Sequence, residues 1–232
     1  STITGTDSVG GVVGRNYSRV GGAMGQGYTE GPAVVRNCST DANTSVTSTG
    51  SNAGGIVGYN YGATIIECKN YADVTGNETV GGICGYSRDY HHNKDGFIIA
   101  CTSYESATIT ATKHVGGIVG YTLADNQHTN TYMPIVACTS LSEIASTGTS
   151  KGCIDGRVDH NTRFIACVAL KNGATKIVGK GSGEIVESYL YDADDVGTAA
   201  EVAAMNVAID EFNAQAPEEA KCNHTWVATT GL

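Results

Sequence analysis

A glycine-rich phrase of seven residues recurs along this chain and constrains its fold more than any other feature. Its copies are VGGVVGR at 9–15, AGGIVGY at 53–59, VGGICGY at 80–86, VGGIVGY at 115–121 and the degenerate KGCIDGR at 151–157. An apolar segment that ends in a cysteine follows each copy. These cysteines are Cys38, Cys68, Cys101, Cys138 and Cys167, and a sixth, shorter copy has Ser188 in the same place. Internal repetition of this kind predicts a structure built from stacked units.

The length variation is confined to one part of the repeat. From each cysteine to the next glycine phrase the distance is 13 to 16 residues, whereas from phrase to cysteine it ranges from 14 to 28. In a solenoid the turns share one core, and insertions at an equivalent corner leave on the same side of the stack. The segments are rich in Val, Ile and Thr and are separated by Gly, Asn and Ser, which indicates strands and turns. We therefore predict an all-β fold, a right-handed parallel β-helix (β-solenoid) of about six coils over residues 1–191.

The glycines have an expected structural role at corners and where coils pack closely, because a Cβ would clash there or φ must be positive. They are Gly54, Gly55, Gly58, Gly81, Gly82, Gly85, Gly116, Gly117 and Gly120. The aliphatic residue after each glycine pair is expected to point inward. These residues are Val12, Ile56, Ile83, Ile118 and Ile154.

The eight cysteines follow the repeat and contain no C-x-x-C pair. We interpret the repeated ones as a buried column of free thiols that fills a narrow interior. A disulfide, for instance through Cys222, and a metal site remain open as alternatives.

The composition changes after Tyr191. Thr198 and Glu201 fit a capping box, and apolar residues at helical spacing follow from Val202 to Phe212. We predict that residues 192–232 form a capping helix and a closing strand at Cys222–Thr229 that cover the exposed edge of the solenoid. Trp226 is expected to anchor this segment in the core.

The repeat resembles the GLUG-motif repeats, which are named for a Gly-Gly-aliphatic-x-Gly phrase. The residues that carry the resemblance are Gly54-Gly55-Ile56-Val57-Gly58-Tyr59 with Ile65-Ile66-Glu67-Cys68-Lys69-Asn70, and their counterparts over about residues 3–188. Such repeats occur in large bacterial surface proteins, including adhesin-like proteins and non-catalytic regions of IgA-specific metallopeptidases. The resemblance implies a β-solenoid stalk or adhesion module that is secreted or held at a bacterial cell surface, and it brings no catalytic residues with it.

The ends of the repeat region are atypical. The copy at 151–157 departs from the pattern at Cys153 and Asp155, which we interpret as the approach to an end of the solenoid. Ile3-Thr4-Gly5 matches the mid-repeat segment Val74-Thr75-Gly76, so we expect the chain to begin partway round a coil of a longer protein.

Charge and motifs exclude several functional classes. The net charge of −9 and the pI near 5.0 argue against nucleic acid or an anionic membrane as the partner. No apolar run approaches the ~18–20 residues of a membrane span, so this segment is not expected to insert. The chain has no H-E-x-x-H motif and no phosphate-binding loop, and we expect no cofactor.

Two groups of residues are candidates for binding a ligand. Tyr59, Tyr86 and Tyr121 follow the glycine phrase in adjacent coils, where they pack under the corner loops or stack against sugar rings. The loops inserted after the phrase supply polar residues that stacking would bring together, as a solvated surface or as a metal, carbohydrate or catalytic site. These loop candidates are Asp89, His91, His92, Asp125, His128, Asp159 and His160.

Three functional hypotheses follow. The first is a non-enzymatic surface module that binds a glycan, a host surface or a matrix protein. The second is a β-helix enzyme that acts on a polysaccharide, for which the cluster of Asp155, Arg157, Asp159, His160 and Arg163 is the support. The third is a spacer without a ligand.

Overall fold

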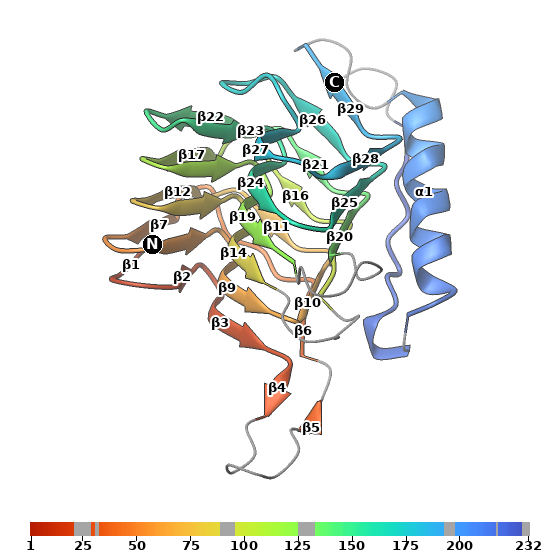
Figure 1. Cartoon of the computed structure of the whole chain (residues 1–232), viewed down its shortest axis with the longest axis horizontal. Coiled ribbons are helices and arrows are strands. Elements are labelled where there is room, and N and C mark those ends of the chain that lie inside the picture. Colours follow the sequence, from red (N-terminus) through yellow and green to blue (C-terminus); the bar gives the residue numbers. More distant parts are fainter. Residues whose placement is uncertain are drawn as a thin grey trace.

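The computed structural model of the chain describes residues 1–20, 29–30, 33–88, 96–124, 133–192, 198–216 and 218–228. Within these residues the chain winds into a parallel β-helix, and equivalent strands of successive coils stack into five parallel sheets (Figure 1). This confirms the predicted β-solenoid.

Each coil contributes at most one strand to each sheet, and we name the sheets A to E in chain order. Sheet A contains β1 (Thr2–Gly5), β7 (Ser45–Ser48), β12 (Asp73–Gly76), β17 (Thr108–Ala111) and β22 (Glu143–Ser146). Sheet B contains β2 (Val9–Gly10), β8 (Asn52–Gly54), β13 (Thr79–Gly81), β18 (His114–Gly116) and β23 (Ser150–Gly152). Sheet C contains β3 (Val13–Tyr17), β9 (Val57–Tyr61), β14 (Cys84–Arg88), β19 (Val119–Leu123), β24 (Asp155–Asp159) and β27 (Val178–Gly181). Sheet D contains β6 (Val34–Arg36), β10 (Thr64–Ile66), β15 (Ile98–Ile99), β20 (Met133–Val136), β25 (Thr162–Ile165) and β28 (Glu184–Val186). Sheet E contains β11 (Lys69–Asn70), β16 (Thr102–Ser103), β21 (Thr139–Ser140), β26 (Val168–Leu170) and β29 (Tyr189–Tyr191).

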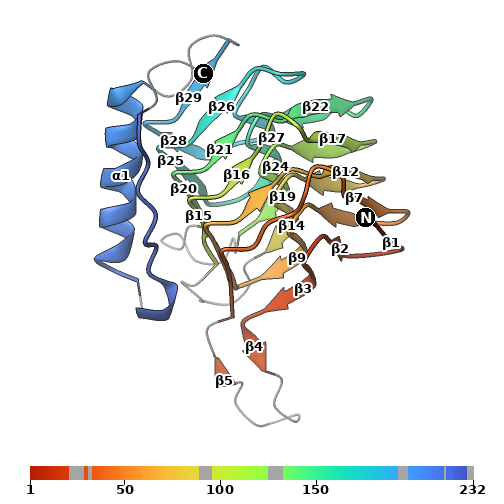
Figure 2. The same cartoon turned by 180° about the vertical axis from the view of Figure 1, so that it is seen from behind.

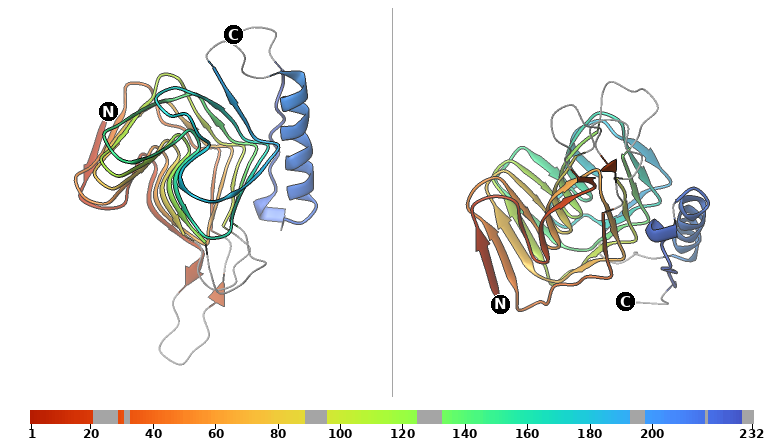
Figure 3. Two further views of the ribbon diagram at one scale, coloured as in Figure 1. Left: turned by 45° about the horizontal axis from the view of Figure 1, so that its top comes forward. Right: turned by 90° about the horizontal axis from the view of Figure 1, so that it is seen from below.

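The coils stack in register, so equivalent residues form columns. We number the coils 1 to 6 after the six strands of sheet C. Tyr61, Arg88, Leu123 and Asp159 pair with one another at the end of sheet C, and the variable segments leave the coil after them. In coil 1 this segment includes the antiparallel pair β4 (Arg19–Val20) and β5 (Thr29–Glu30). In the described part of the chain the coils are therefore interrupted at one corner, as the spacing predicts, and Figure 3 shows the β4–β5 pair projecting there.

The phrase glycines are required because backbone of the same turn and of the neighbouring coil lies where a side chain would be. A Cβ on Gly116 would lie 2.0 Å from the Val119 carbonyl oxygen and 2.6 Å from the Gly156 nitrogen. The same clash recurs at Gly54 and Gly81. None of the phrase glycines has a positive φ, so close packing rather than the left-handed conformation explains them.

The left-handed conformation occurs instead at the residue before each cysteine of the column, between sheets D and E. These residues are Asn37, Glu67, Ala100, Ala137, Ala166 and, before Ser188, Glu187, with φ between 45° and 55°. At this corner the cysteine thiols point inward and donate to backbone carbonyls. Cys101 Sγ lies 3.3 Å from its own coil's Ile99 oxygen and 3.7 Å from the Ile65 oxygen of the coil before.

Ser188 makes the equivalent pair of bonds, at 3.1 Å to the oxygens of Phe164 and Val186. All eight cysteines are free, so the disulfide alternative is wrong. The column therefore fills the interior and also satisfies carbonyl groups at the corner, which is why serine can replace cysteine in the last coil.

The inward aliphatic column is confirmed for the middle of the stack. Ile56, Ile83, Ile118 and Ile154 are fully buried, whereas Val12 in coil 1 is 45% exposed because no described coil lies beneath it. In coil 5, Cys153 occupies the place of a phrase glycine. Across the core from it, Ala169 takes the place of the serine that abuts Gly117 in coil 4, which leaves room for the thiol.

The C-terminal helix α1 (Ala199–Asn213) begins with the predicted capping box of Thr198 and Glu201. It does not cover the end of the solenoid. Its buried side chains, Met205, Ile209 and Phe212 among them, pack on Ile66, Ile99 and Val136, on the outer face of sheet D. Figures 1 and 2 show the helix running along the flank of the stack rather than over its last coil. The prediction of an edge cap is therefore wrong, because the outer face of sheet D is apolar and needs cover.

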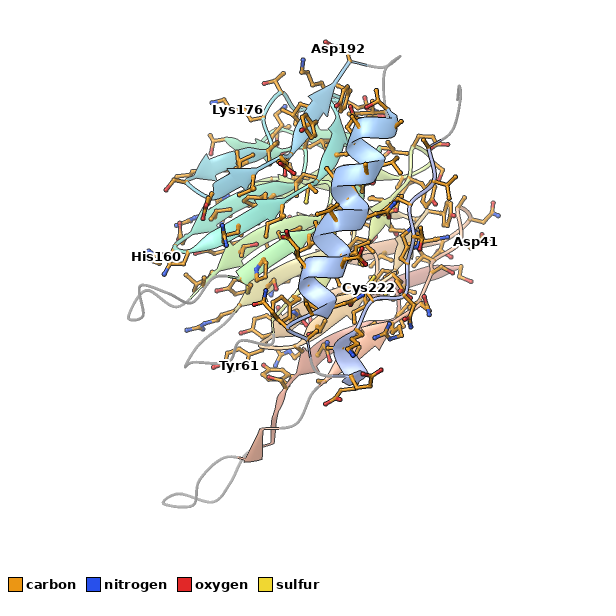
Figure 4. The ribbon with its side chains drawn as sticks, turned by 90° about the vertical axis from the view of Figure 1, so that its right-hand side faces the viewer. Asp41, Tyr61, His160, Lys176, Asp192 and Cys222 are labelled. Carbon is orange, nitrogen blue, oxygen red and sulfur yellow. The ribbon has the colours of Figure 1, made fainter. Side chains whose placement is uncertain are left out.

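The helix and the segment after it, residues 198–228, run along the stack from coil 6 to coil 2, and we call them the strap. At its start, Glu201 accepts a hydrogen bond from Tyr191 in coil 6. Beyond the 3-10 helix η1 (Glu218–Ala220), the Asn223 amide donates to Glu67 Oε1 in coil 2 at 2.6 Å, beside Cys222 (Figure 4). Residues 221–228 are not a strand, and Trp226 packs against the helix cluster, as expected of an anchor. No helix in the described part of the chain is long and apolar enough to cross a membrane.

The clash at the phrase glycines predicts that alanine destabilises the protein at a phrase glycine but not at a glycine with open space around it. Gly116→Ala is expected to lower the free energy of unfolding by about 3 kcal/mol or more, because the clash is with backbone that cannot move aside. Gly96→Ala is the control, since its Cβ would meet nothing closer than 3.6 Å. Urea unfolding measures both, and equal stability of the two variants would contradict this explanation of the phrase.

The strap predicts a local effect at Glu67. Coils 3 to 5 have alanine at the equivalent left-handed position, so Glu67→Ala should not strain the backbone. The substitution does remove the acceptor for the Asn223 amide. We expect a loss of about 1–3 kcal/mol and faster hydrogen exchange over residues 221–228. Glu187→Ala, at the exposed equivalent corner of coil 6, should change neither the stability nor the hydrogen exchange of residues 221–228. An equal effect of this variant would argue against a role of the Glu67–Asn223 hydrogen bond in holding the C-terminal segment.

Candidate functional site

The outer face of sheet C carries a cluster of tyrosine and cationic side chains, and we call it the tyrosine face. In the second half of the sheet C strands the side chains alternate, so that the third and fifth residues face outward and the fourth faces inward, whereas the first residue also lies in the core. The residues in register with Tyr86 in the other coils form one partly exposed column, and those in register with Arg88 form a second. The first column is Arg15, Tyr59, Tyr86, Tyr121, Arg157 and Lys180. The second is Tyr17, Tyr61, Arg88, Leu123 and Asp159.

The tyrosine rings of this face contact one another. Tyr86 and Tyr121 stack with centroids 4.9 Å apart at 14°, and Tyr59 meets Tyr86 edge to face at 5.2 Å. Tyr17 lies 5.5 Å from Tyr61 at 27°. Ring faces are therefore largely turned toward neighbouring rings, which supports the packing interpretation of the ladder. The outer edges and hydroxyl groups remain partly exposed.

A polar cluster lies at the upper end of the face. Asp159 accepts hydrogen bonds from Arg157 at 2.6 and 3.2 Å and from the Tyr121 hydroxyl at 2.6 Å. The Arg157 guanidinium carbon lies 4.8 Å above the Tyr121 ring, and its Nη1 lies 3.4 Å from His114 Nε2. Arg157 is thus fixed between a carboxylate, an aromatic ring and an imidazole.

These contacts set the protonation states of the cluster. Burial alone would raise the pKa of Asp159, but the hydrogen bonds from Arg157 and Tyr121 outweigh it and leave that pKa below its usual value. Burial and the nearby Arg157 charge lower the pKa of His114. Burial raises the pKa of Tyr86 to about 12. Near neutral pH the cluster therefore holds a carboxylate, a neutral imidazole and neutral phenols.

A hollow of about 370 Å³ opens beside the lower half of the tyrosine face, over coils 1 to 3. Its lining combines aromatic, charged and amide side chains, namely Asp7, Ser8, Arg15, Tyr17, Ser51, Asn52, Tyr59, Glu78 and Tyr86. Arg15 is oriented there by Asp7 at 2.8 Å and by Ser8 at 3.2 Å. The hollow is of a size that holds a small ligand or one or two sugar residues.

A second hollow, of about 610 Å³, lies along the edge of sheet A. Its lining residues are threonine, serine, alanine, glycine and Asn77 from the segments 47–49, 75–77, 110–112 and 145–147. No charged or aromatic side chain lines it. The tyrosine face is therefore the better candidate for a specific site.

Asp155 lies inside the solenoid, opposite the tyrosine face. It is fully buried, accepts a hydrogen bond from the Thr122 hydroxyl and another from the Arg157 amide at 3.0 Å. Burial raises the pKa of Asp155 well above its usual value, and the two hydrogen bonds only partly offset this. Asp155 is therefore a protonated core residue rather than part of a surface site.

The structure separates the predicted site residues into three groups. Tyr59, Tyr86, Tyr121 and Asp159 lie together on the tyrosine face. His160 is exposed at the corner where the loops leave, with φ of 64° (Figure 4). Asp89, His91, His92, Asp125 and His128 lie outside the described residues.

The cluster proposed for an enzyme is not one site. Asp155 points into the core, Arg157 and Asp159 lie on the outer face of sheet C, and Arg163 pairs with Glu184 on sheet D at 2.8 Å. The prediction grouped them by sequence proximity. Strict alternation would place Asp155, Arg157 and Asp159 on one face of β24, but the strand departs from alternation between Asp155 and Arg157, and Asp155 is buried. Among the described residues, no three His, Cys, Asp or Glu side chains are grouped to hold a metal ion.

The second column of the face was not among the residues predicted from the sequence. Tyr17, Tyr61 and Arg88 stand two residues after Arg15, Tyr59 and Tyr86. The signal was available, because a strand of period two places residues i and i+2 on one face. Counting outward positions from each phrase would have found both columns.

Comparisons with known proteins agree with this architecture. The sequence profile of the GLUG motif matches residues 49–75, which run from the end of β7 through one coil to β12. The chain contains a GLUG motif. A crystal structure of a candidate immunoglobulin A1 protease from Bacteroides ovatus is similar in fold, with a TM-score of 0.53 and 20% identity. The match covers 90% of this chain and 60% of the other chain. Among curated proteins, none matches this chain significantly.

Asp155 and Asp159 predict opposite pH effects on the stability of this GLUG-motif protein. The native pKa of Asp155 is raised, so the folded state keeps a proton that the unfolded state releases above pH ~3.9, and stability falls as pH rises through this window. Asp155→Asn should therefore gain stability over wild type from pH 4 to pH 8. The native pKa of Asp159 is lowered, so the advantage of wild type over Asp159→Asn should be present at pH 7 and fade toward pH 3.

Urea midpoints measured at several pH values test this pair of variants. Parallel pH profiles for wild type and Asp155→Asn would show that the buried carboxyl does not carry the proton inferred for it.

Proposed function

We propose that this GLUG-motif protein is a non-enzymatic binding module of a secreted or surface-held bacterial protein, and that its tyrosine face binds a polysaccharide. The observation that carries the proposal is the clustering of Tyr17, Tyr59, Tyr61, Tyr86 and Tyr121 with three arginines on one face beside a hollow. Tyrosine and arginine combine apolar area with directional hydrogen bonds, which suits sugars. The in-register coils repeat this chemistry along the stack, as a polymer requires.

The protonation states of Asp155 and Asp159, the two acids of the enzyme hypothesis, favour binding over hydrolysis. A general acid must keep its proton near neutral pH and reach the substrate. Asp159 faces outward but is held as a carboxylate by Arg157, and Asp155 keeps its proton but is fully buried. Neither residue combines the two properties that the general acid of glycoside hydrolysis needs.

The surface location rests on the GLUG resemblance. A stack of coils projects a face along its length, and this suits a module that holds or spaces a partner outside the cell. Adhesion to a glycan-coated surface would use the tyrosine face in the same way.

A substitution in the middle of the ladder tests the proposal. Tyr86→Ala removes the ring between Tyr59 and Tyr121, and we expect binding to an immobilised polysaccharide panel to weaken about tenfold, or about 1.4 kcal/mol. The matched control is Tyr104→Ala, because Tyr104 stacks on Tyr71 at 4.2 Å at the far corner of the coil. Biolayer interferometry on both variants, with melting curves to confirm folding, gives the comparison.

Equal losses in the two variants, or none in either, would count against the tyrosine face. The same preparations are incubated with the bound polysaccharides, and with immunoglobulin A1 because of the description of the structural neighbour. Release of reducing ends or of peptide fragments would overturn the non-enzymatic part of the proposal.

A further inference from the structure

We infer that the polysaccharide is acidic and carries its negative charge on every second sugar. This inference rests on the proposed function and names the ligand class of the same face. It follows from the positions of the arginines relative to the coils, from their orientation and from the local charge.

The charge of the tyrosine face is opposite to that of the chain. The whole protein has 23 acidic and 14 basic side chains, a net charge of −9. The two columns of the face contain Arg15, Arg88, Arg157 and Lys180 against the single carboxylate Asp159. At its sheet B border lie Asp7 and an ion pair of Glu78 with Lys113. The face therefore remains positive, by about two charges, in an acidic protein.

The arginines occur in alternate coils. Coil 1 presents Arg15, coil 3 presents Arg88 and coil 5 presents Arg157, whereas coils 2 and 4 present only uncharged side chains on the face. Adjacent strands are about 4.8 Å apart, so the cations recur every ~10 Å along the stack. A sugar in an extended chain advances by about one coil, and a disaccharide by about two. Lys180 in coil 6 continues the positive charge beyond this period.

The uncharged coils supply the complementary surface. Tyr59 and Tyr61 in coil 2 and Tyr121 in coil 4 offer ring edges and hydroxyl groups between the cations, and Leu123 in coil 4 adds an apolar side chain. A chain lying along the stack would thus meet an arginine and an aromatic level in turn. A polymer charged on every sugar would place half of its anions against levels without a cation.

The arginines are held in place before a ligand arrives. Asp7 and Ser8 orient Arg15, and Asp159 and the Tyr121 ring orient Arg157. Arg88 lies close enough to Tyr59 to hydrogen-bond its hydroxyl. Prior ordering lowers the entropy cost of binding, and a guanidinium can serve a carboxylate or a sulfate.

The test compares polymers that differ in charge spacing. Hyaluronan carries a carboxylate on every second sugar, its carboxyl-reduced form carries none, and polygalacturonate carries one on every sugar. Keratan sulfate presents sulfate in place of carboxylate. Calorimetry at low and high salt is expected to show hyaluronan or keratan sulfate bound more tightly than the other two, with affinity falling as salt screens the arginines.

Three variants locate the effect. Arg15→Gln, Arg88→Gln and Arg157→Gln should each weaken binding roughly tenfold. Arg163→Gln, whose arginine pairs with Glu184 on sheet D, is the matched control and should stay within about twofold. Arg88→Lys keeps the charge and should recover part of the loss if the fold is intact.

The outcomes separate the inference from the proposed function. Equal binding of hyaluronan and its carboxyl-reduced form, still weakened by Tyr86→Ala, would overturn the acidic ligand and leave the tyrosine face as the site. Tighter binding of polygalacturonate would overturn the alternate spacing. Binding of no polysaccharide would overturn both.

Discussion

Backbone hydrogen bonds between parallel, in-register coils are the interaction on which the rest of this structure depends. They form only if neighbouring coils approach to about 4.8 Å at every corner. At the turn between sheets B and C that approach leaves no space for a Cβ, because a Cβ on Gly54, Gly81 or Gly116 would lie 2.6 to 2.7 Å from a backbone nitrogen of the next coil. Close stacking of the coils therefore requires glycine at these positions, and a repeat that kept the strands but lost these glycines could not stack.

In-register stacking turns every position of the repeat into a column, with consequences inside and outside the helix. Inside, the isoleucines after the glycine pairs and the cysteine thiols repeat their contacts from coil to coil. Outside, the last position of the phrase becomes a ladder of tyrosines bounded by arginines. The same geometry that stabilises the core therefore generates a periodic surface. A face built in this way matches a polymer better than a compact ligand.

The fold was largely predictable because its constraints are local and repeated. The glycine phrase, the cysteine spacing and the single variable corner define the coil, and the capping box of Thr198 and Glu201 marks the helix. The position of that helix was not predictable, because it depends on the outward-facing apolar column of Ile66, Ile99 and Val136. The residues before them in the sequence are also apolar, so the sequence does not show which side chains face outward. The hydrogen bond between Glu67 and Asn223 joins residues 156 positions apart, and no local sequence pattern predicts it.

The candidate site was predictable in part. Tyr59, Tyr86 and Tyr121 were visible as a column. Strict alternation would place Asp155 and Asp159 on the same face of β24, so only the local departure from alternation at the start of this strand, seen in the structure, separates them. Arg15, Arg88 and Arg157 occupy different columns and alternate coils, so their relation appears only after the register is known. The whole-chain charge obscured this face, because a net charge of −9 says nothing about where the bases lie.

The most direct test of the central claim is an NMR titration of the protein labelled with 13C at its tyrosine rings. Addition of hyaluronan oligosaccharides should shift the resonances of Tyr59, Tyr86 and Tyr121, while Tyr71 and Tyr104, stacked on each other away from this face, stay unchanged. Saturable shifts confined to the ladder would establish the tyrosine face as the binding surface. Shifts at Tyr71 and Tyr104, with none in the ladder, would contradict it.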